Sequence, residues 1–477
     1  MELSQDLWPV SLTIVDWTIR IGAVLIVPFR RSADAAKAWL LALFVFPIPA
    51  AILYAVIGRA RHPRWRRARV KRLPEILDAA LADARTDPAA HVVRPPEDCR
   101  HLARLAKAMS QMPAVGGNMV DLQADYDRAI RRLVDDIDAA RAHVHLMFYI
   151  FADDSAGDLI MSALERAVAR GVTCRLMIDA LGSMSWSGAV RRRMEAAGVD
   201  FDLMLPLGIV GRVSRADMRN HRKVAVIDGR IGWTGSQNIV ACVGGDGMPN
   251  RELLVRLTGP AVAQLQLVFI GDWFLETDDR LTGPDLFPQP DIAEPGSAAQ
   301  IVASGPDYPH ARIDMLFTTM LHAARERAVL ATPYFIPSDA LVMALRTAAQ
   351  RGVTVDLFLS ARTDSRTVDF AQQSYFADLM AAGVGIHLYE GEFLHAKHVS
   401  IDDRIALIGS SNIDMRSFEL NSEVALISYS PDIVSALRDI EDDYRRRSRT
   451  CDLGAWRQRG LYRKTLENIA RMAGPLL

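Results

Sequence analysis

The stretch HRKVAVIDGRIGWTGSQN at residues 221–238 is matched by HAKHVSIDDRIALIGSSN at residues 395–412. Both stretches follow one pattern, H-x-K-x4-D-x6-G-S-x-N, with six identical residues at identical spacing. A single H-x-K tripeptide carries little information, whereas six fixed positions repeated within one chain indicate a duplicated unit of domain size. The chain therefore contains two copies of one motif-bearing unit.

The duplication continues upstream of each motif. Two apolar stretches separated by a helical pattern precede each motif, at residues 143–150 and 171–179 for the first and at 328–335 and 352–359 for the second. Short apolar runs that alternate with helical patterns are typical of βαβ units and a mostly parallel sheet. We therefore expect an α/β protein with two pseudo-equivalent halves, at about residues 121–290 and 291–450, with one H-x-K site each.

Composition indicates a folded protein without an overall preference for nucleic acid. The chain has 477 residues, half of them hydrophobic, and a formal net charge of −1. It can therefore bury two sizeable cores, but it presents no global positive charge. The four cysteines lack C-x-x-C spacing, which argues against a zinc site or a disulfide framework and fits a reducing compartment. They are Cys99, Cys174, Cys242 and Cys451.

Residues 1–58 read as a membrane region with two hydrophobic segments, at about 8–28 and 38–57. The second segment is uncharged and long enough to cross a hydrocarbon core of roughly 30 Å, so we expect it to span the membrane. Asp16 and Arg20 interrupt the first segment, although their i,i+4 spacing allows them to pair. A cleaved signal peptide does not fit, because no basic segment precedes the first stretch and the second is too long.

A basic run follows this region, in what we expect to be a juxtamembrane linker and helical segment at residues 59–120. The positive-inside rule places everything after Gly58 in the cytoplasm. We interpret the run as a contact for anionic lipid headgroups rather than for nucleic acid, because it directly follows a membrane segment and the rest of the chain is acidic. Its members are Arg59, Arg61, Arg64, Arg66, Arg67, Arg69, Lys71 and Arg72.

The paired motifs supply the side chains that a phosphodiester reaction needs. The charge of a phosphodiester repels nucleophiles, so a site must provide cations for the phosphate oxygens, a nucleophile, and an acid for the leaving oxygen. On a strand alternate residues share a face, so each motif histidine would project beside its lysine. We expect this set to work without a metal ion or a cofactor. The candidates are His221, Lys223, Asn238, His395, Lys397 and Asn412.

The acidic residues near the motifs take other roles. Alternation places Asp228 and Asp402 on the face opposite their histidines, so we assign them to structural hydrogen bonds. A nucleophilic histidine also needs a partner for its second ring nitrogen. Glu252 and Glu423 are the candidates, since each opens an apolar strand, 31 and 28 residues after the histidine of its motif.

Three further histidines are interpreted as structural. His143 and His145 flank the start of a strand and have no counterpart in the second half. His398 lies on the face opposite His395, which is typical of a buried or edge histidine.

The doubled pattern resembles the phospholipase D superfamily, in which two such motifs form one active site across a pseudo-twofold interface. The hydrophobic N-terminus and the stretches FYIF at 148–151, TPYFIP at 332–337 and SNIDMRS at 411–417 are similar to those of bacterial cardiolipin synthases. This resemblance covers nearly the whole chain.

The resemblance implies a phosphatidyl transfer. In that family one histidine attacks the phosphorus of phosphatidylglycerol and releases glycerol, and a second phosphatidylglycerol then attacks the phosphatidyl-histidine to give cardiolipin. By resemblance His221 would be the nucleophile and His395 the general acid and base, although the motifs alone do not break their symmetry. The phosphate oxygens would be held by Lys223, Lys397, Asn238 and Asn412, with Ser236 and Ser410 as further candidates.

Two other function classes remain open at this point. A membrane-bound phospholipase D hydrolase, or another phosphatidyltransferase, would use the same residues with a different acceptor. A non-enzymatic lipid-binding scaffold is disfavoured, because both motifs are complete. The resemblance also implies a multi-pass protein of the bacterial inner membrane, with phosphatidylglycerol and anionic lipids as partners. Residues 451–477 are predicted to form an amphipathic helix that docks on the core or touches the membrane.

Overall fold

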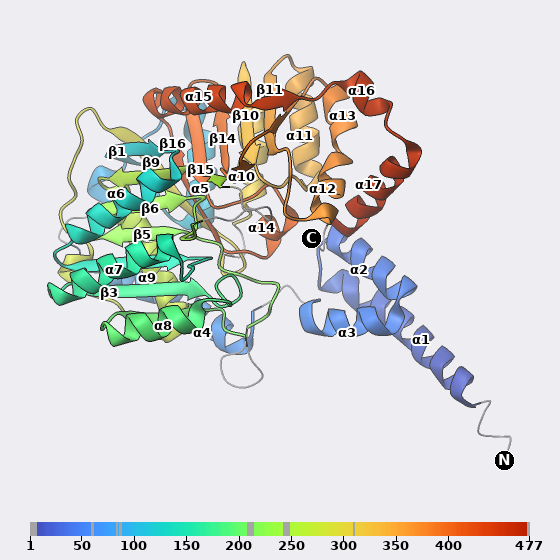
Figure 1. The fold of residues 1–477 in the computed structure, drawn as a ribbon, viewed down its shortest axis with the longest axis horizontal. Coiled ribbons are helices and arrows are strands. Elements are labelled where there is room, and N and C mark those ends of the chain that lie inside the picture. Colours follow the sequence, from blue (N-terminus) through green and yellow to red (C-terminus); the bar gives the residue numbers. More distant parts are fainter. Residues whose placement is uncertain are drawn as a thin grey trace.

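One fifteen-stranded sheet runs through both halves of the main body (Figure 1). The computed structural model describes residues 7–58, 62–82, 84, 88–207, 214–241, 249–308 and 311–474. The strand order is β17-β12-β11-β10-β14-β15-β16-β9-β1-β8-β6-β5-β2-β3-β4. The expected α/β fold is confirmed, and the sheet joins the two halves edge to edge.

Each half contributes seven strands in the same order. Strands β2, β3 and β4 are parallel, as are β10, β11 and β12, whereas the remaining neighbours in each half pair antiparallel. β1 and β9 pair antiparallel at the centre, which makes the halves approximately twofold related. The first half comprises β1 (Val115–Gln123), β2 (His143–Phe148), β3 (Thr173–Asp179), β4 (Asp200–Met204), β5 (Val224–Ile227), β6 (Ile231–Gly235) and β8 (Leu254–Thr258). The second comprises β9 (Ser297–Ser304), β10 (Arg327–Thr332), β11 (Thr354–Ser360), β12 (Gly385–Tyr389), β14 (His398–Ile401), β15 (Ile405–Gly409) and β16 (Glu423–Ser428), with β17 (Ser448–Thr450) added at its edge.

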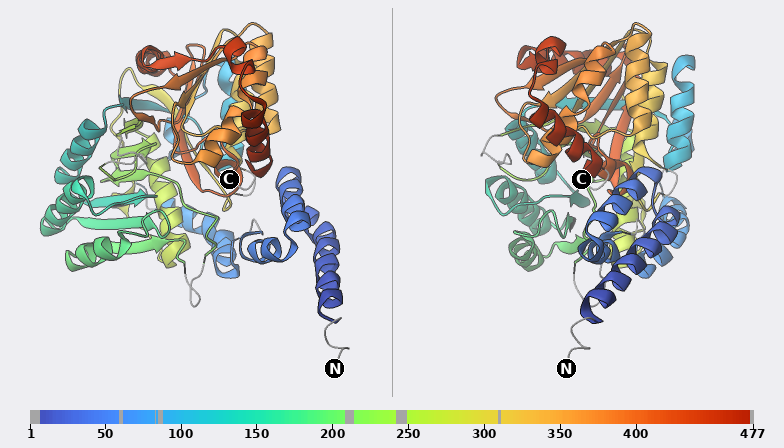
Figure 2. Two further views of the ribbon diagram at one scale, coloured as in Figure 1. Left: turned by 45° about the vertical axis from the view of Figure 1, so that its right-hand side comes forward. Right: turned by 90° about the vertical axis from the view of Figure 1, so that its right-hand side faces the viewer.

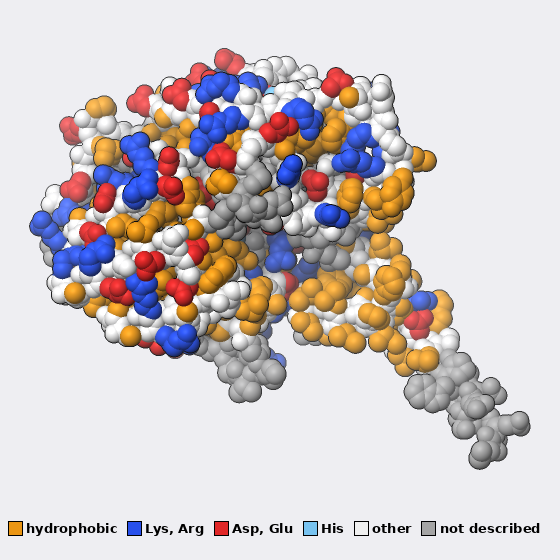
Figure 3. Space-filling view, in the orientation of Figure 1, with side chains coloured by type: hydrophobic (Ala, Val, Ile, Leu, Met, Phe, Trp, Pro, Cys, Tyr) orange, Lys and Arg blue, Asp and Glu red, His pale blue; other side chains and the backbone are white. Residues whose placement is uncertain are grey.

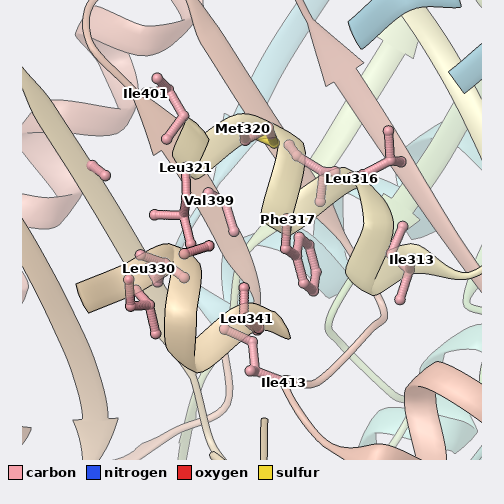
Figure 4. Close-up of a cluster of buried hydrophobic side chains, with 14 of the residues drawn as sticks. Ile313, Leu316, Phe317, Met320, Leu321, Leu330, Leu341, Val399, Ile401 and Ile413 are labelled. Atoms are coloured by element: carbon pink, nitrogen blue, oxygen red, sulfur yellow. The ribbon is translucent and has the colours of Figure 1, made fainter. Parts of the chain in front are cut away.

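Helices cover both faces of the sheet, so most strands are continuous apolar runs. α9 and α15 pack on a central core that draws residues from both halves, and the outer helices pack on a separate core in each half. Figure 4 shows part of the second-half core, where Leu321 lies beside Leu330 and Val399. The helices of the body are α5 (Arg100–Ser110), α6 (Tyr126–Asp138), α7 (Ser155–Ala169), α8 (Ser187–Ala196), α9 (Ala261–Thr277), α10 (Ile313–Ala323), α11 (Asp339–Gln350), α12 (Arg366–Gln373), α13 (Phe376–Ala381), α14 (Met415–Glu419) and α15 (Pro431–Arg446).

The N-terminal region is a helical arm that projects from this body (Figures 1 and 2). Its first helix, α1 (Leu7–Ile26), belongs to the one stretch among the described residues that is long and apolar enough to cross a membrane, and only a small part of it is buried in the structure. Asp16 and Arg20 form the expected ion pair, with a 3.1 Å contact.

The expected span at 38–57 is wrong as a single helix. It is divided into α2 (Ala33–Val45) and α3 (Pro47–Ile57), of 13 and 11 residues. Proline at the first position of α3 has no N–H to continue α2, and it moves Phe46 out of the helical region, to φ −129° and ψ 69°. At 1.5 Å per residue neither piece covers a hydrocarbon core of roughly 30 Å.

Part of the basic run contacts protein rather than lipid. Arg66 lies in α4 (Arg64–Ala82), is fully buried, and pairs with Glu276 and with Asp307 at 2.8 Å. Arg69 donates to backbone carbonyls of α9, and Arg72 contacts Asp278. The expected lipid contact is therefore wrong for the buried Arg66, whereas the Arg72 side chain remains 42% exposed. Arg64, Arg67 and Lys71 are exposed, while Arg59 and Arg61 lie outside the described residues.

The C-terminal segment contains two helices rather than one, α16 (Leu453–Arg457) and α17 (Leu461–Ala473). α17 docks on α12 through its polar face, where Arg463 donates to Gln373. Its other face leaves large apolar side chains exposed: Leu461, Tyr462, Ile469 and Met472.

Candidate active site

The second motif is positioned by a short strand pair between the halves. β13 (Phe393–Leu394) pairs in parallel with β7 (Asn250–Arg251). His395 directly follows β13, and Glu252 directly follows β7. The backbone N–H of His395 donates to the carbonyl of Arg251 at 2.9 Å. Residues that follow a parallel pair remain side by side, so His395 meets the glutamate of the other half.

The first motif is positioned in the same way. Asn220 and Ser422 form an isolated parallel bridge, directly before His221 and Glu423. The N–H of His221 donates to the carbonyl of Ser422 at 2.9 Å. Arg222, a position that the sequence analysis did not assign, adds a fully buried guanidinium that donates to the carbonyl of Glu423 at 3.0 Å. Each motif is thus held by backbone from the opposite half.

The two histidine–glutamate pairs are therefore crossed between the halves. Nδ1 of His395 lies 2.7 Å from Oε1 of Glu252, and Nδ1 of His221 lies 3.1 Å from both carboxylate oxygens of Glu423. Chain order assigns each glutamate to the histidine of its own half, and that pairing is wrong. A carboxylate at Nδ1 holds the proton on that nitrogen and leaves Nε2 as the basic atom.

Ser236 and Ser410 contact the two glutamates, while their expected place around a phosphate stays a prediction. The hydroxyl of Ser236 donates to Glu252 at 2.5 Å, and that of Ser410 donates to Glu423. Each hydroxyl also accepts the N–H of the residue that follows its glutamate. Both serines are fully buried. These contacts orient the two carboxylates.

Burial keeps the resting imidazoles neutral. It lowers the pKa of His221 to about 4, against the opposing effect of Glu423. Burial also lowers the pKa of His395, while the closer carboxylate of Glu252 opposes the decrease. Although burial alone would raise the pKa of Glu252, its contact with His395 holds that pKa at about 2. The site thus combines neutral imidazoles with ionised glutamates.

The two lysines lie beside their histidines but not on a strand. The H-x-K tripeptides end just before β5 and β14, so the expected strand geometry is wrong there. Nζ of Lys223 donates to the carbonyl of His221 at 2.7 Å, and Nζ of Lys397 donates to that of His395 at 2.6 Å. Burial lowers the pKa of Lys223 to about 7 and that of Lys397 to about 8.

Asn238 and Asn412 lie on the wall of one cavity with the two histidines. The side-chain oxygen of Asn238 accepts a hydrogen bond from the backbone N–H of Ile150 at 3.1 Å, and its side-chain amide nitrogen takes no part in this contact. The amide nitrogen of Asn412 donates to Asp414 at 3.0 Å. Both asparagines are therefore held by protein contacts on the wall of this cavity.

Asp228 and Asp402 lie at the far ends of β5 and β14 from the histidines. The Asp228 carboxylate accepts the N–H groups of Arg141, Ala142 and His143, at 2.7–2.9 Å. Asp402 does the same in the second half for residues 325–327. Both have left-handed backbone, with φ of 53° and 50°, a conformation that aspartate tolerates in tight turns. They stabilise the turns rather than contact the cavity.

The cavity between the halves has a volume of about 400 Å³ and contains residues that the sequence analysis did not assign. Tyr149 packs edge-on against His221, with ring centres 4.9 Å apart, and Tyr334 follows β10 in the equivalent place. Their matching positions after β2 and β10 were the signal that could have identified them. Arg219 and Arg416 add positive charge to the wall. Among the described residues, no three His, Cys, Asp or Glu side chains are grouped to hold a metal.

The three histidines that were interpreted as structural are buried away from this cavity, as expected. His145 stacks on Phe269 and contacts Gln266, and His143 lies beside it. His398 lies 3.3 Å from Glu441.

Comparisons with known proteins agree with this geometry. A family model described as the phospholipase D-like domain of cardiolipin synthase matches residues 133–273 and 317–443. Cardiolipin synthase A of Cronobacter sakazakii is 33% identical over 98% of this chain and 99% of that protein. The Salmonella arizonae protein of the same name is 32% identical over the same shares. Among solved structures, phosphatidylserine synthase of Haemophilus influenzae superposes with a TM-score of 0.60 at 12% identity, covering 79% of this chain and 100% of that one.

The fold and the paired histidines define a phosphatidyltransferase of the phospholipase D superfamily. Within that class, the chain belongs to the cardiolipin synthase family. The resemblance noted from the sequence is therefore confirmed over nearly the full length.

Proposed function

We propose that the enzyme joins two phosphatidylglycerol molecules through a phosphatidyl-histidine at His221. The observation that supports this most directly is the placement of His221 and His395 on one cavity, each with Nδ1 against a carboxylate. In the first step Nε2 of His221 attacks phosphorus, the bond to the headgroup glycerol breaks, and His395 gives that oxygen a proton. In the second step His395 removes a proton from the glycerol hydroxyl of the acceptor, whose oxygen displaces His221 and forms cardiolipin.

The differences between the two histidines support this assignment of roles. A nucleophile must be neutral, and the low pKa of His221 favours that form. A general acid must be protonated, and the 2.7 Å contact of His395 with Glu252 is the shorter of the two pairs. The anionic donor itself raises the pKa of groups in the cavity when it binds.

The cations and amides would hold the phosphate oxygens. Lys223 and Lys397 are buried next to their histidines, and each ammonium donates to the carbonyl of its histidine. Asn238 and Asn412 complete the set from the loops after β6 and β15. Their charge and dipoles would stabilise the extra negative charge that develops at phosphorus.

We also propose that the N-terminal arm anchors the enzyme in the bacterial inner membrane, with the main body in the cytoplasm. The apolar length of α1 supports a membrane location, and the exposed Arg64, Arg67 and Lys71 support contact with anionic headgroups. A second passage by α2 and α3 together would complete the multi-pass arrangement.

The decisive experiment incubates membranes containing the protein with phosphatidylglycerol alone, followed by mass analysis of the lipids. We expect cardiolipin and glycerol in equal amounts. A hydrolase would instead produce phosphatidic acid, with water as the acceptor, and would refute the transfer. Membranes containing the His221→Ala variant are the control for endogenous activity.

A further inference from the structure

A second cavity lies between the N-terminal arm and the second half of the body. Its volume is about 370 Å³, and its wall is formed by α2, the loop after β10, and the ends of α14 and α17. Most of its lining is apolar or aromatic, and includes Ala38, Leu41, Ile336, Tyr375, Met415 and Met472. The polar part of the wall is formed by Lys37, Ser338, Asp339 and Arg471. Two methionines give such a wall adaptable, polarisable surface.

This arm cavity adjoins the catalytic cavity. Ile336 lines both of them. Met415 lines the arm cavity, while its neighbours Asp414 and Arg416 line the catalytic one. A single layer of side chains therefore separates the catalytic cavity from the arm cavity, which α2 lines.

The outer side of the arm cavity lies among exposed apolar surface. In Figure 3 apolar side chains gather on the N-terminal helices and on the adjoining surface of the second half. On α2 and α3 these include Leu41, Val45 and Ile52, and on α17 they include Leu461 and Ile469. Figure 2 shows α17 beside the arm in both views. The arm cavity thus lies between the apolar exterior and the catalytic cavity.

We propose that the arm cavity is the passage that holds the acyl chains of one phospholipid while its headgroup lies in the catalytic cavity. This inference rests on the proposed function, because it concerns the same substrate class. The phosphorus must reach the buried His221, yet each methylene left in water during that approach costs about 0.8 kcal/mol. An apolar passage that begins at the membrane-facing helices and ends at Ile336 removes that cost.

The test narrows the passage from α2 without touching the catalytic cavity. Ala38→Trp and Leu41→Trp each place a bulky ring in the arm cavity. Val45→Trp is the matched control, because Val45 is exposed on the same helix and lies outside the residues that line the cavity. Rates are measured with long-chain phosphatidylglycerol in vesicles and with a short-chain, water-soluble phosphatidylglycerol.

We expect the two cavity variants to lose about tenfold or more of the long-chain rate, since the contacts of about two methylenes are worth that factor. Their short-chain rate should stay within about twofold of the parent enzyme, and Val45→Trp should match the parent on both substrates. Equal losses on both substrates, or no loss on the long chains, would overturn the passage. If the parent enzyme makes cardiolipin from neither lipid, the proposed function fails instead.

A second measurement does not depend on the variants folding. Phosphatidylglycerol with a photoreactive group in one acyl chain is irradiated with the full-length enzyme in vesicles, with and without excess unlabelled lipid. We expect label that unlabelled lipid suppresses on peptides containing Ala38–Leu41 and Ile336–Asp339. Label confined to α1 and α3 would overturn the proposal.

Discussion

Glu423, in the second half of the chain, lies with both carboxylate oxygens 3.1 Å from Nδ1 of His221, in the first half. Glu252 of the first half contacts His395 of the second in the same manner. Neither half therefore contains a complete catalytic unit, and both imidazoles depend on the interface between β7 and β13 and the bridge of Asn220 with Ser422. Catalysis is expected to fail whenever that interface opens.

The roles of the two histidines can be separated by trapping the covalent enzyme. A lipid with a radiolabelled phosphate and a nitrophenol-like leaving group needs no proton for its departure. We expect acid-quenched label on the His395→Ala protein and none on His221→Ala, because in the proposed mechanism only His221 forms the bond to phosphorus. With phosphatidylglycerol itself, His395→Ala should lose about 10²- to 10⁴-fold in rate. The reverse labelling pattern would exchange the two roles.

The pairing of each histidine with the glutamate of the opposite half can be tested by substituting the glutamates one at a time. In the His395→Ala background, Glu423→Gln should slow labelling of His221 by about 100-fold, because the carboxylate that holds its tautomer is lost. Glu252→Gln should change labelling little in that background, since its partner is already absent. The measurement is the rate of label uptake with the activated lipid. A large effect of Glu252→Gln with none of Glu423→Gln would contradict the geometry.

The buried lysines predict that phosphodiester binding weakens as pH rises. The pKa is about 7 for Lys223 and about 8 for Lys397, so both ammonium groups lose their charge at a pH well below the pKa of an ordinary lysine. A soluble phosphodiester such as glycerophosphoglycerol does not titrate in this range, so its affinity reports the lysines. We expect the affinity to fall by up to about tenfold per pH unit above pH 7. The measurement is calorimetric titration from pH 6 to pH 9.

Lys223→Arg is the control for this pH dependence. The guanidinium remains charged throughout the range, so the decline should begin later and follow Lys397 alone. A pH-independent affinity in the parent enzyme would show that the lysines stay charged in the cavity.

Asp228 and Asp402 should contribute to stability rather than to chemistry. Asp228→Ala removes the acceptor of three backbone N–H groups and places alanine at a positive φ, so we expect a loss of about 1–3 kcal/mol in the free energy of unfolding. Asp228→Asn tolerates the same backbone and should lose less. Thermal unfolding checks both. Activity per folded molecule should stay within a few-fold of the parent, and a 100-fold loss would assign the residue to catalysis.

Buried and exposed arginines of the basic run should respond differently to substitution. Arg66→Gln leaves two buried carboxylates without their cation and should destabilise the protein by about 3–5 kcal/mol. The exposed pair Arg64→Gln and Arg67→Gln should leave the melting temperature unchanged and reduce binding to anionic vesicles. Vesicle co-sedimentation at two salt concentrations checks the second effect. Equal vesicle binding by the double variant would remove lipid contact from this helix.

Local pattern and duplication were sufficient to predict much of this protein. The repeated motif identified His221, Lys223, His395 and Lys397, and the alternation of apolar runs with helical patterns predicted the α/β fold. These inferences succeed because strand and helix periodicity are properties of short stretches. The doubled motif also implied the family, since identical spacing through six positions reflects one constrained site.

Only the tertiary structure decided which glutamate serves which histidine. Glu252 and His395 are 143 residues apart, and their contact depends on strands of two residues whose pairing no periodicity encodes. The same holds for Arg66, whose burial depends on carboxylates supplied by α9 and by Asp307. The break between α2 and α3 was partly predictable from the sequence. Pro47 indicates a helix break, but the hydropathy average over residues 38–57 does not register a single proline. Long-range contacts depend on how the two halves pack against each other, and local sequence patterns do not indicate which distant residues meet in that packing.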